Sequence, residues 1–518
     1  MHALSTGADT IVSILTRRAS EQPSAPFLLF DDLDGGVQRR SYEAMATRAA
    51  LTAGVLASHG IGRGDKVHVH LWNCPEFFDL WFGAAWLGAV IVPTNPLLTA
   101  NELAYVVGHA ATKLSVTQPD LLSPLSSAVG DRPVLVTGEP ADGAGSFDDE
   151  LARASAIGPR HPVPADVAAV LYTSGTTSRP KGVLVTHANY LHVGEVVAQH
   201  LRVSPGDRML ITLPLFHANA QYYSTMPGLV TGSSVIVMAR FSASRWATVA
   251  AQHHATLASL FAAPIRMLLA QPRSEDDARN ELRAVLFSQN VTEVQLEEFE
   301  VRFGCPLLQL YGMTETIAPP TLNPLYGERR NMTIGRPTLG ARLRVVGEDG
   351  ADVNDGEVGE LLVGGEPSAT LMAGYLGDDE ATRAAVVEGW LHTGDNVCVD
   401  GAGYFHFVDR AKDMIKRAGE NVAASEIESA INAHPSVFES AAIGVPDAMR
   451  DEAIKAYVVL ANKTGVTEDE LIEWCASRLA AFKVPGNIEF VDGLPRTSVG
   501  KIQKEELRQG RASGWGEG

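Results

Sequence analysis

Short apolar runs separated by segments of helix length recur along much of the chain. They include Val67–Leu71, Ala89–Val92, Ser234–Val237 and Ala284–Phe287. Runs without polar alternation are typical of strands that are buried on both faces, and helix-length connections allow neighbouring strands to run parallel. The sequence therefore predicts an α/β fold built around mainly parallel sheets.

The glycine-rich region from Gly335 to Gly374 has a different pattern. Short runs in which polar and apolar residues alternate occur around Arg342–Val346 and Glu360–Val363, and such alternation is typical of half-buried strands. With 518 residues and 45% hydrophobic content, the chain is long enough for roughly two to four folding units. We therefore expect a large N-terminal domain of layered α/β subdomains together with a small β-subdomain.

The charge balance excludes some classes of partner. Asp and Glu outnumber Lys and Arg by 61 to 42, which gives a formal net charge of −19. A chain this acidic is not expected to bind nucleic acid or anionic membrane surfaces through its overall field. The most apolar long stretch, Phe77–Val92, is interrupted by Asp79 and by glycines. It predicts a buried helix that leads into a strand, and no membrane span.

Cysteine usage and the N-terminal residues favour a cytoplasmic location. The cysteines are scattered without C-x-x-C spacing, at Cys74, Cys305, Cys398 and Cys475, so neither a zinc site nor a disulfide framework is indicated. Residues 1–10 lack the basic patch and apolar core of a signal peptide. The sequence does not indicate an oligomeric state, and a dimer stays open.

One loop has the composition of a phosphate-binding turn. It reads Tyr172-Thr-Ser-Gly-Thr-Thr-Ser-Arg-Pro-Lys-Gly182 and follows a predicted buried strand, Val167–Tyr172. Backbone N–H groups of such a turn, hydroxyl donors and a lysine can converge on anionic oxygens, although the spacing is not that of a Walker loop. An ordinary solvated turn is the alternative. The candidate nucleotide-binding residues of this loop are Thr173, Ser174, Gly175, Thr176, Thr177 and Lys181.

Five further segments follow in order along the chain. They are Leu213-Pro-Leu-Phe-His217, Tyr311-Gly-Met-Thr-Glu315, Gly389-Trp-Leu-His-Thr-Gly-Asp395, Asp409-Arg-Ala-Lys-Asp-Met-Ile415 and Leu494-Pro-Arg-Thr-Ser-Val-Gly-Lys501. With the loop, this series resembles the acyl-adenylate-forming superfamily, and in particular its acyl-CoA ligases. The resemblance extends from about Ser41 to Leu507 and therefore covers most of the chain.

Three other strings narrow the resemblance. His59-Gly-Ile-Gly-Arg-Gly-Asp-Lys66, Asn73-Cys-Pro-Glu-Phe77 and Tyr311-Gly-Met-Thr-Glu-Thr-Ile317 are similar to those of the bacterial carnitine/crotonobetaine-type CoA ligases. This affinity does not identify the substrate. A place in a bacterial diterpenoid antibiotic pathway is a further expectation, which no motif carries.

The resemblance implies an AMP-forming acid–thiol ligase. Such an enzyme joins a small-molecule carboxylic acid to ATP, which yields acyl-AMP and pyrophosphate, and then transfers the acyl group to coenzyme A. A carboxylate is already a nucleophile, so the first step needs positive charge and no general base. By resemblance, Lys501 bridges the carboxylate and the α-phosphate, Thr314 contacts that phosphate, and Glu315 holds Mg²⁺, which prefers oxygen ligands.

The resemblance also implies a nucleotide pocket. Asp395 would accept hydrogen bonds from the ribose hydroxyls, and Arg410 would reach the ribose or the phosphates. The remaining members of this set are Asn290, Tyr311, Gly312 and Phe407. Ordinary explanations exist as well, because an Asp after Gly is commonly part of a turn and an Arg beside Asp commonly forms a surface pair.

The acyl group is expected to lie among residues from several segments. His217 would gate or shape this pocket, although a lone histidine after an apolar run is more often a core residue. The expected lining is His217, Gln221, Ala262, Pro264, Gln289, Gly312 and Met313. A mixture of aromatic, small and polar residues in these segments suits a bulky, mainly apolar acid.

The resemblance further implies a small, mobile α+β lid at the C-terminus. The hinge falls near Lys412, so we expect domains at residues 1–409 and 410–518. In one pose Lys501 would face the adenylate. In the other, the lid would rotate and present its CoA-binding residues to a pantetheine tunnel; these are Ala418, Gly419, Glu420 and Asn421.

Three positions depart from the family's pattern. Ser178 stands where the phosphate loop usually has Gly, Phe287–Asn290 replaces small residues beside the adenine, and Ala418 replaces the first Gly of the lid loop. These changes are either neutral, or they weaken adenylation and leave an enzyme that takes a preformed acyl-adenylate from a partner.

Other functions share some of these motifs. A stand-alone domain that loads a carrier protein is one, but its amino-acid-activating members typically have an Asp where this chain has Ser242, so an α-amino acid is disfavoured. A luciferase-type oxygenase and a non-catalytic nucleotide-binding module are further alternatives. The presence of Glu315, Asp395, Arg410 and Lys501 argues against the non-catalytic module.

Overall fold

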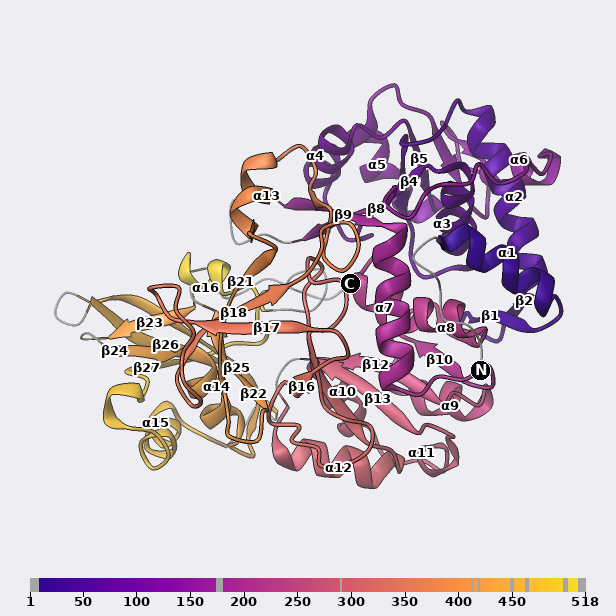
Figure 1. Cartoon of the computed structure of the whole chain (residues 1–518). Helices are drawn as coiled ribbons and strands as arrows, with labels where there is room; N and C mark the ends of the chain where they lie inside the picture. Colours follow the sequence, from indigo (N-terminus) through magenta and orange to yellow (C-terminus); the bar gives the residue numbers. More distant parts are fainter. Residues whose placement is uncertain are drawn as a thin grey trace.

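The computed structural model describes residues 9–173, 180–288, 291–410, 413–417, 420–447, 451–461, 465–496 and 502–510. Its large N-terminal part contains two mixed sheets with helices packed around them (Figure 1). The order of the first sheet is β19-β9-β8-β4-β3-β5-β6-β7. Its strands are β3 (Lys66–His70), β4 (Val90–Pro93), β5 (Leu114–Thr117), β6 (Val134–Val136), β7 (Gly145–Ser146), β8 (Val167–Thr173), β9 (Lys181–Thr186) and β19 (Gly374–Tyr375).

The order of the second sheet is β16-β15-β14-β13-β12-β10-β11-β1-β2. Its strands are β1 (Pro26–Asp31), β2 (Val37–Ser41), β10 (Arg208–Ile211), β11 (Ser234–Met238), β12 (Leu257–Phe261), β13 (Ala284–Ser288), β14 (Leu307–Tyr311), β15 (Thr321–Leu322) and β16 (Arg336–Pro337). The neighbours from β14 through β10 and β11 to β1 pair in parallel, as do β8, β4, β3, β5, β6 and β7 in the first sheet. The predicted α/β class with mainly parallel sheets is confirmed.

The strands β3, β4, β11 and β13 coincide with the predicted apolar runs to within one residue at each end. The helices of this part are α1 (Ile11–Glu21), α2 (Tyr42–Ser58), α3 (Pro75–Leu87), α4 (Ala100–Ala110), α5 (Leu122–Val129), α6 (Phe147–Arg153), α7 (His187–His200), α8 (Met226–Thr231), α9 (Trp246–Gln252), α10 (Ala262–Leu269), α11 (Asp276–Arg279) and α12 (Glu293–Phe303). A 3₁₀ turn, η1 (Pro119–Leu121), and a π-helix, η2 (Ala220–Thr225), complete the list.

Helix α3 shows how the sequence sets one of these elements. Pro75 occupies its first turn, and Gly88 ends it in the left-handed conformation, at φ 71°, where glycine avoids the steric penalty of a side chain. Nearly all its residues are buried, and the buried Asp79 is paired with Arg40 at 2.5 Å and Arg48 at 2.6 Å. The predicted buried helix is confirmed, and no helix within the described residues has the length and apolar character needed to cross a membrane.

The predicted β-subdomain is present and extends further than Gly374. A five-stranded sheet contains β17 (Arg342–Val346), β18 (Gly359–Gly364), β20 (Val386–Val387), β21 (Trp390–Val399) and β22 (Phe405–Arg410), and α13 (Asp379–Ala385) lies between β19 and β20 in the chain. The pairing of β19 with β9 ties this region to the first large sheet.

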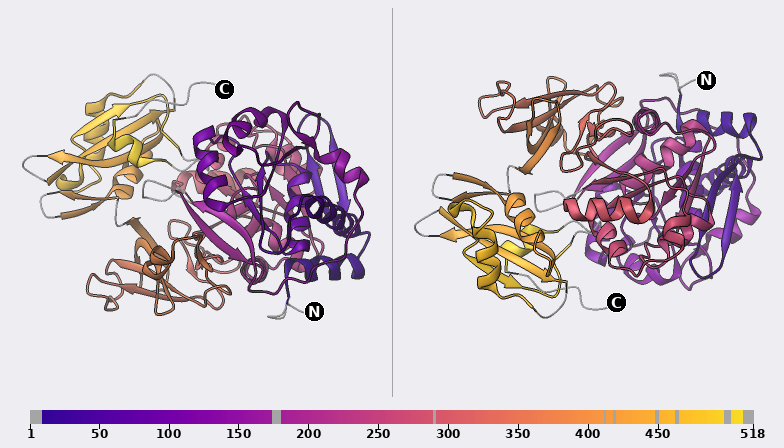
Figure 2. Two further views of the ribbon diagram at one scale, coloured as in Figure 1. Left: turned by 90° about the horizontal axis from the view of Figure 1, so that it is seen from above. Right: turned by 90° about the horizontal axis from the view of Figure 1, so that it is seen from below.

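The C-terminal part is a separate α+β unit. Its sheet contains β23 (Met414–Arg417), β24 (Glu420–Ala423), β25 (Val437–Asp447), β26 (Asp451–Leu460) and β27 (Asn487–Phe490). Its helical elements are α14 (Ala424–Asn432), α15 (Glu468–Ala476), the 3₁₀ turn η3 (Ala481–Lys483) and α16 (Lys504–Arg508). Figure 2 shows this unit and the β-subdomain as two lobes beside the large body. We call the C-terminal unit the lid; the boundary at residue 409 stays a prediction.

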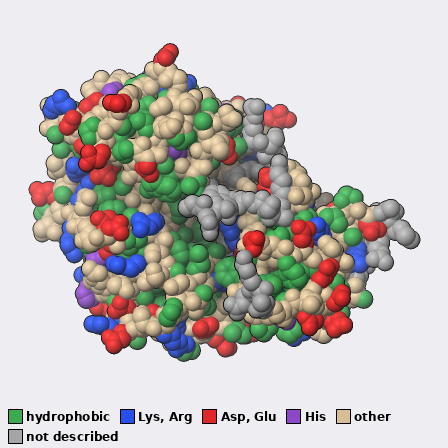
Figure 3. Space-filling view, turned by 180° about the vertical axis from the view of Figure 1, so that it is seen from behind, with side chains coloured by type: hydrophobic (Ala, Val, Ile, Leu, Met, Phe, Trp, Pro, Cys, Tyr) green, Lys and Arg blue, Asp and Glu red, His purple; other side chains and the backbone are tan. Residues whose placement is uncertain are grey.

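One face of the molecule shows how its charged side chains are distributed. On the face seen from behind, acidic and basic side chains are interspersed around the edge, and hydrophobic side chains gather near the middle (Figure 3). A mixed surface of this kind offers no extended positive field to a polyanion.

Candidate active site

The predicted nucleotide residues Tyr311 and Asp395 lie together. Tyr311 ends β14 and Asp395 lies on β21, and the Tyr311 hydroxyl donates to Asp395 Oδ2 at 2.5 Å. Both residues are buried. The ring of Phe407, on β22, lies 6.4 Å from the Tyr311 ring, centroid to centroid. The backbone of Arg410 lies opposite that of Asp395 in the antiparallel β21–β22 ladder. Four of the predicted residues thus come from three elements to one place.

Glu315 has a partner that sequence reasoning missed. The residue is 6% exposed, and its Oε1 accepts a hydrogen bond from the Tyr375 hydroxyl at 3.0 Å. The ring of Tyr375 lies under the ammonium of Lys181, 4.7 Å from Nζ. Burial, with the Glu315 charge nearby, raises the pKa of Tyr375 well above its usual range. One tyrosine therefore links the predicted phosphate-loop lysine to the predicted magnesium ligand.

The short strand β19 places Tyr375 there. It pairs with β9 so that Tyr375 is opposite Val183, two residues after Lys181. A two-residue strand has no sequence periodicity, and tyrosine carries no charge at neutral pH, so nothing in the motif pattern singled it out. Its position after Gly374, the last residue of the glycine-rich region, was the signal available.

The phosphate-type loop is anchored at both ends by α4. The Tyr105 hydroxyl donates to the Pro180 carbonyl at 3.0 Å, and His109 Nδ1 lies 2.7 Å from the Tyr172 hydroxyl. Thr173 and Lys181 face each other in the β8–β9 ladder at the base of the loop. Sequence reasoning did not identify these two α4 side chains as functional, since each is an ordinary amphipathic-helix residue by composition.

The turn after β14 is compact. The Thr316 hydroxyl donates to the Met313 carbonyl at 3.0 Å and also accepts from the Met313 N–H at 3.0 Å. A Cβ on Gly312 would lie 2.5 Å from the Tyr223 hydroxyl, so only glycine fits this position without a shift. The predicted Gly312, Met313 and Thr314 therefore lie on a turn whose shape is closely determined.

The predicted acyl side of the site is aromatic. His217 packs against Phe216 and Phe261, with ring centroids 6.2 Å and 6.0 Å away. Ala262, in the first turn of α10, is buried and follows Phe261, whereas Pro264 is half-buried. These contacts place the His217 ring against Phe216 and against Phe261, the residue directly before α10.

Gln221 is fully buried on the π-helix η2 and bonds to protein groups. It accepts from the Tyr190 hydroxyl and donates to the Leu215 carbonyl at 2.7 Å. The neighbouring Tyr222 hydroxyl reaches the Thr314 carbonyl at 3.5 Å. π-Helical turns occur frequently at functional sites, and this one packs the acyl side against the turn that carries the predicted Thr314.

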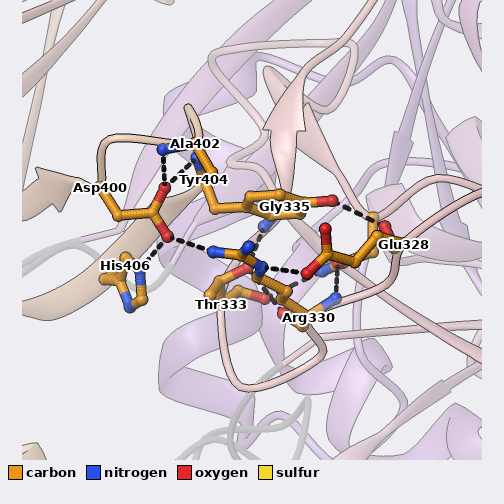
Figure 4. A network of polar contacts seen from close by, with 9 residues as sticks. Glu328, Arg330, Thr333, Gly335, Asp400, Ala402, Tyr404 and His406 are labelled. Carbon is orange, nitrogen blue, oxygen red and sulfur yellow. Dashed lines mark hydrogen bonds and ion pairs between the residues drawn. The ribbon is translucent and has the colours of Figure 1, made fainter.

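A polar network fixes the β21–β22 hairpin that carries Asp395 (Figure 4). Arg330 donates to Glu328 Oε1 at 2.8 Å and to Asp400 Oδ2 at 2.9 Å, and its guanidinium lies 4.7 Å from the Tyr404 ring centroid. Hydrogen bonds from the Tyr404 backbone and other groups hold the pKa of Asp400 well below its usual range. The network joins the segment after β15 to the hairpin and so restrains the two strands that carry Asp395 and Phe407.

The buried carboxylate of Glu315 could hold a magnesium ion together with the phosphates of a nucleotide. Among the residues that the structure describes, no group of three or more His, Cys, Asp or Glu side chains forms a metal cluster. Mg²⁺ is commonly bound through one or two carboxylates plus substrate phosphates, and the buried carboxylate of Glu315 fits that kind of site.

Several predicted residues lie outside the described part of the chain. They are Ser174, Gly175, Thr176, Thr177, Ser178, Gln289, Asn290, Lys412, Ala418, Gly419 and Lys501, together with the side chains of Arg410, Glu420 and Asn421. Their roles stay predictions.

Comparisons with known proteins agree with these features. The AMP-binding enzyme family matches residues 15–376, and the AMP-binding enzyme C-terminal domain matches residues 426–501. A crotonobetaine/carnitine–CoA ligase of Salmonella typhimurium is 37% identical over 492 residues, which cover 93% of this chain and 95% of that protein.

Solved structures give the same result. The anthranilate CoA ligase AuaEII in complex with anthranoyl-AMP superposes with a TM-score of 0.90 at 25% identity, covering 98% of both chains. ATP-bound MatB from Rhodopseudomonas palustris superposes with a TM-score of 0.86 at 29% identity, covering 96% of this chain and 98% of MatB. The chain therefore belongs to the AMP-binding enzyme family, as an AMP-forming acyl-CoA ligase that acts through an acyl-adenylate and uses ATP, Mg²⁺ and coenzyme A.

Proposed function

We propose that this ligase activates a bulky, mainly apolar carboxylic acid and that its lid rotates between the two half-reactions. The observation that carries the substrate class is the absence of charge from the acyl side. No Asp, Glu, Lys or Arg occurs in residues 213–226, 257–265 or 284–291. A second ionic group on the acid would find no opposite charge there, and burying it unpaired is costly.

The aromatic residues of the predicted acyl side could accept one kind of acid with a second charge, a quaternary ammonium acid. Tyrosine and phenylalanine faces attract quaternary ammonium groups, and the Salmonella relatives are crotonobetaine/carnitine–CoA ligases. The same rings also suit an aromatic or polycyclic acid, and AuaEII is an anthranilate CoA ligase. We favour acids whose only ionic group is the reacting carboxylate. The ring of His217 packs tilted against Phe216 and edge to face against Phe261, and the segments of these residues contain no acidic residue.

In the adenylation step, we assign the positive charge to Lys501 and Lys181. Lys501 would bridge the incoming carboxylate and the α-phosphate, and Lys181 would lie on the pyrophosphate side. When bound at Glu315, Mg²⁺ would neutralise phosphate charge. Thr314 and the predicted loop hydroxyls would donate to the phosphate oxygens, and Asp395 would accept from the ribose. This arrangement provides positioning and charge stabilisation, which are what the reaction needs.

In the thioester step, we assign the lid loop of residues 418–421 to the CoA passage. Two structures of one relative support a movable lid. ATP-bound and apo MatB match this chain with TM-scores of 0.86 and 0.76, although both comparisons have 29% identity and cover 96% of this chain. This chain therefore superposes better on the ATP-bound structure of MatB than on the apo structure.

Thioester formation from a supplied adenylate alone, and loading of a carrier protein, stay open as alternatives. The departures that suggested the former, at Ser178, Gln289 and Ala418, lie outside the described residues. No observation favours either alternative. The cytoplasmic location and the pathway also stay predictions.

A panel of acids tests the substrate class. Purified protein with Mg-ATP and CoA would be given benzoate, anthranilate, decanoate, a polycyclic acid, crotonobetaine and a dicarboxylate, and kcat/KM would be measured for each. We expect kcat/KM for the aromatic, fatty or polycyclic acids to exceed that for crotonobetaine and the dicarboxylate, which carry a second ionic group, by at least about tenfold. This ratio corresponds to about 1.4 kcal/mol of transition-state stabilisation. Preference for crotonobetaine or for the dicarboxylate would contradict the proposed class.

The role of Lys501 is tested by separating the half-reactions. We expect Lys501→Ala to abolish acyl-AMP formation while leaving thioester formation from synthetic acyl-AMP. Equal loss of both activities would contradict the assignment.

A further inference from the structure

An arginine on α10, the helix that follows Phe261, reaches across to the lid. Arg266 lies on α10, and its Nη2 is 3.7 Å from Oε2 of Glu439 on β25. Its guanidinium also lies 6.0 Å from the ring centroid of Phe438, the neighbouring lid residue. The side chains of Arg266 and Glu439 are only 13% and 5% exposed. The contact is therefore a largely buried ion pair between the large body and the lid.

Glu439 also holds the segment that leads to Lys501. Nη2 of Arg496 pairs with the same carboxylate oxygen, Glu439 Oε2. Arg496 forms an isolated antiparallel bridge with Ile502, and the Gln503 N–H donates to the Pro495 carbonyl at 2.7 Å. Lys501 directly precedes Ile502 in the sequence, so the base of its segment is tied to Glu439.

The two ion pairs of Glu439 behave differently when the lid turns. Glu439 and Arg496 both belong to the lid, so their pair moves as one. Arg266 belongs to the large body, so its pair exists only in an arrangement like this one. Burial lowers the pKa of Arg266, and the charge of Glu439 opposes this shift. Pairing therefore offsets part of the cost of burying the two charged groups, and it does so in this arrangement alone. When the lid turns away, Glu439 keeps Arg496 as a partner, so its carboxylate is not left unpaired.

Helix α10 carries both a residue of the predicted acyl lining and the arginine of this pair. Ala262, in the predicted acyl lining, and Arg266 are four residues apart and so lie on one face of the helix. Phe261, directly before the helix, contacts the His217 ring. A shift of α10 on acid binding would move Arg266 relative to the lid.

From these contacts we infer that Arg266 is a positioning residue that latches the lid in the adenylation pose, acting through Glu439 and Arg496 on the segment of Lys501. This inference rests on the proposed alternation of the lid. It assigns the latch to the first half-reaction, because the chain superposes better on the ATP-bound and acyl-adenylate-bound relatives than on apo MatB.

The two half-reactions are measured separately in the full-length chain, with the most active acid of the panel. Acyl-AMP formation is followed by ATP–pyrophosphate exchange without CoA, and thioester formation is followed from synthetic acyl-AMP and CoA. We expect Arg266→Gln to lower the rate of ATP–pyrophosphate exchange by about tenfold, within the range of coupling between contacting residues. The variant removes one charge partner of Glu439 and leaves the other, Arg496. Thioester formation is expected to stay within about twofold of wild type, because the latch is absent from that pose.

Two further variants sharpen the comparison. Arg266→Lys keeps the charge and is expected to recover part of the exchange activity. Arg279→Gln removes an arginine of the large body whose side chain is 68% exposed and is expected to change neither half-reaction. Unchanged exchange in Arg266→Gln, or equal loss of both half-reactions in Arg266→Gln and Arg266→Lys, would overturn the latch.

Lys501→Ala, assayed beside these variants, distinguishes a failure of the latch from a failure of the proposed lid alternation. If it loses exchange alone and Arg266→Gln loses neither activity, the latch is wrong and the alternation stands. If Lys501→Ala loses both half-reactions equally, the proposed division of labour fails, and the latch fails with it.

Discussion

At the scale of single residues, the site depends on side chains that bridge two functional groups. Tyr375 joins Glu315 through its hydroxyl and Lys181 through its ring. Both of these partners were expected from motifs, whereas the tyrosine between them was not. A residue that acts by holding two charged groups carries no signature of its own, so motif reasoning finds the charges and misses the bridge.

We predict that Tyr375→Phe raises the Mg²⁺ concentration needed for half-maximal activity by about threefold to tenfold, because a hydrogen bond to a charged group contributes about 1 kcal/mol or more. The ring remains beside Lys181, so the effect isolates the hydroxyl. Titration of Mg²⁺ at saturating ATP gives the value, and Tyr326→Phe, at a tyrosine that is 74% exposed, is the control. An unchanged Mg²⁺ requirement would mean that Tyr375 does not orient Glu315.

His187 makes stability depend on pH. Burial lowers its pKa from 6.5 to about 4, although Asp166 nearby partly offsets this. The unfolded chain therefore takes up a proton near pH 6.5 and the folded chain only near pH 4, so stability is full above pH 6.5 and falls between pH 6.5 and 4. From pH 7 to pH 5 this histidine alone lowers the free energy of unfolding by about 2 kcal/mol.

We expect His187→Gln to reduce that loss by about 2 kcal/mol, as measured by urea unfolding at pH 7 and pH 5. The exposed His161→Gln is the control and should keep the wild-type difference between the two pH values. The same pH dependence in His187→Gln and wild type would show that His187 is not the titrating group.

At the scale of elements, long apolar runs were predictable and short or irregular elements were not. The helix α3 and the strand β8 fall where the sequence placed them, because burial on both faces leaves an uninterrupted apolar pattern. The π-helix η2 and the two-residue strand β19 have no periodicity to read. Both nevertheless pack against the turn or the strand that carries predicted site residues.

Helix α4 gives a test at this scale. Tyr105 holds the Pro180 end of the phosphate-type loop through one hydrogen bond. We predict that Tyr105→Phe raises the KM for ATP by about fivefold, since a single hydrogen bond contributes about 1 kcal/mol. Thioester formation from supplied acyl-AMP should not change, because that step does not use the pyrophosphate side. Steady-state kinetics with varied ATP supply the first value, and an unchanged KM would remove the anchoring role.

At the scale of the whole molecule, the sequence motifs predicted one chemistry and the fold places their residues on separate bodies. Tyr311, Glu315 and Asp395 belong to the large body and the β-subdomain, whereas the Arg496 segment belongs to the lid. Spacing along the chain says nothing about how far apart such bodies lie. The sequence therefore could not predict the contact between α10 and the lid. The Arg and Glu that form it also belong to no motif that would have singled them out.

The predicted hinge is testable by fixing one dihedral angle. Proline holds φ near −65°, so Lys412→Pro should trap the lid in one pose and depress one half-reaction by about tenfold or more while sparing the other. Separate assays of exchange and of thioester formation from acyl-AMP give the ratio. Wild-type rates in both assays would show that the hinge lies elsewhere.

The central claim is that this single chain makes acyl-AMP from ATP and then converts it to the CoA thioester. Mass spectrometry of reactions with Mg-ATP and the most active acid, with and without CoA and beside reactions given synthetic acyl-AMP, tests it most directly. The account predicts acyl-AMP without CoA and its conversion to acyl-CoA when CoA is added. Thioester formed only from supplied acyl-AMP would contradict it and would leave a chain that performs the second half-reaction alone.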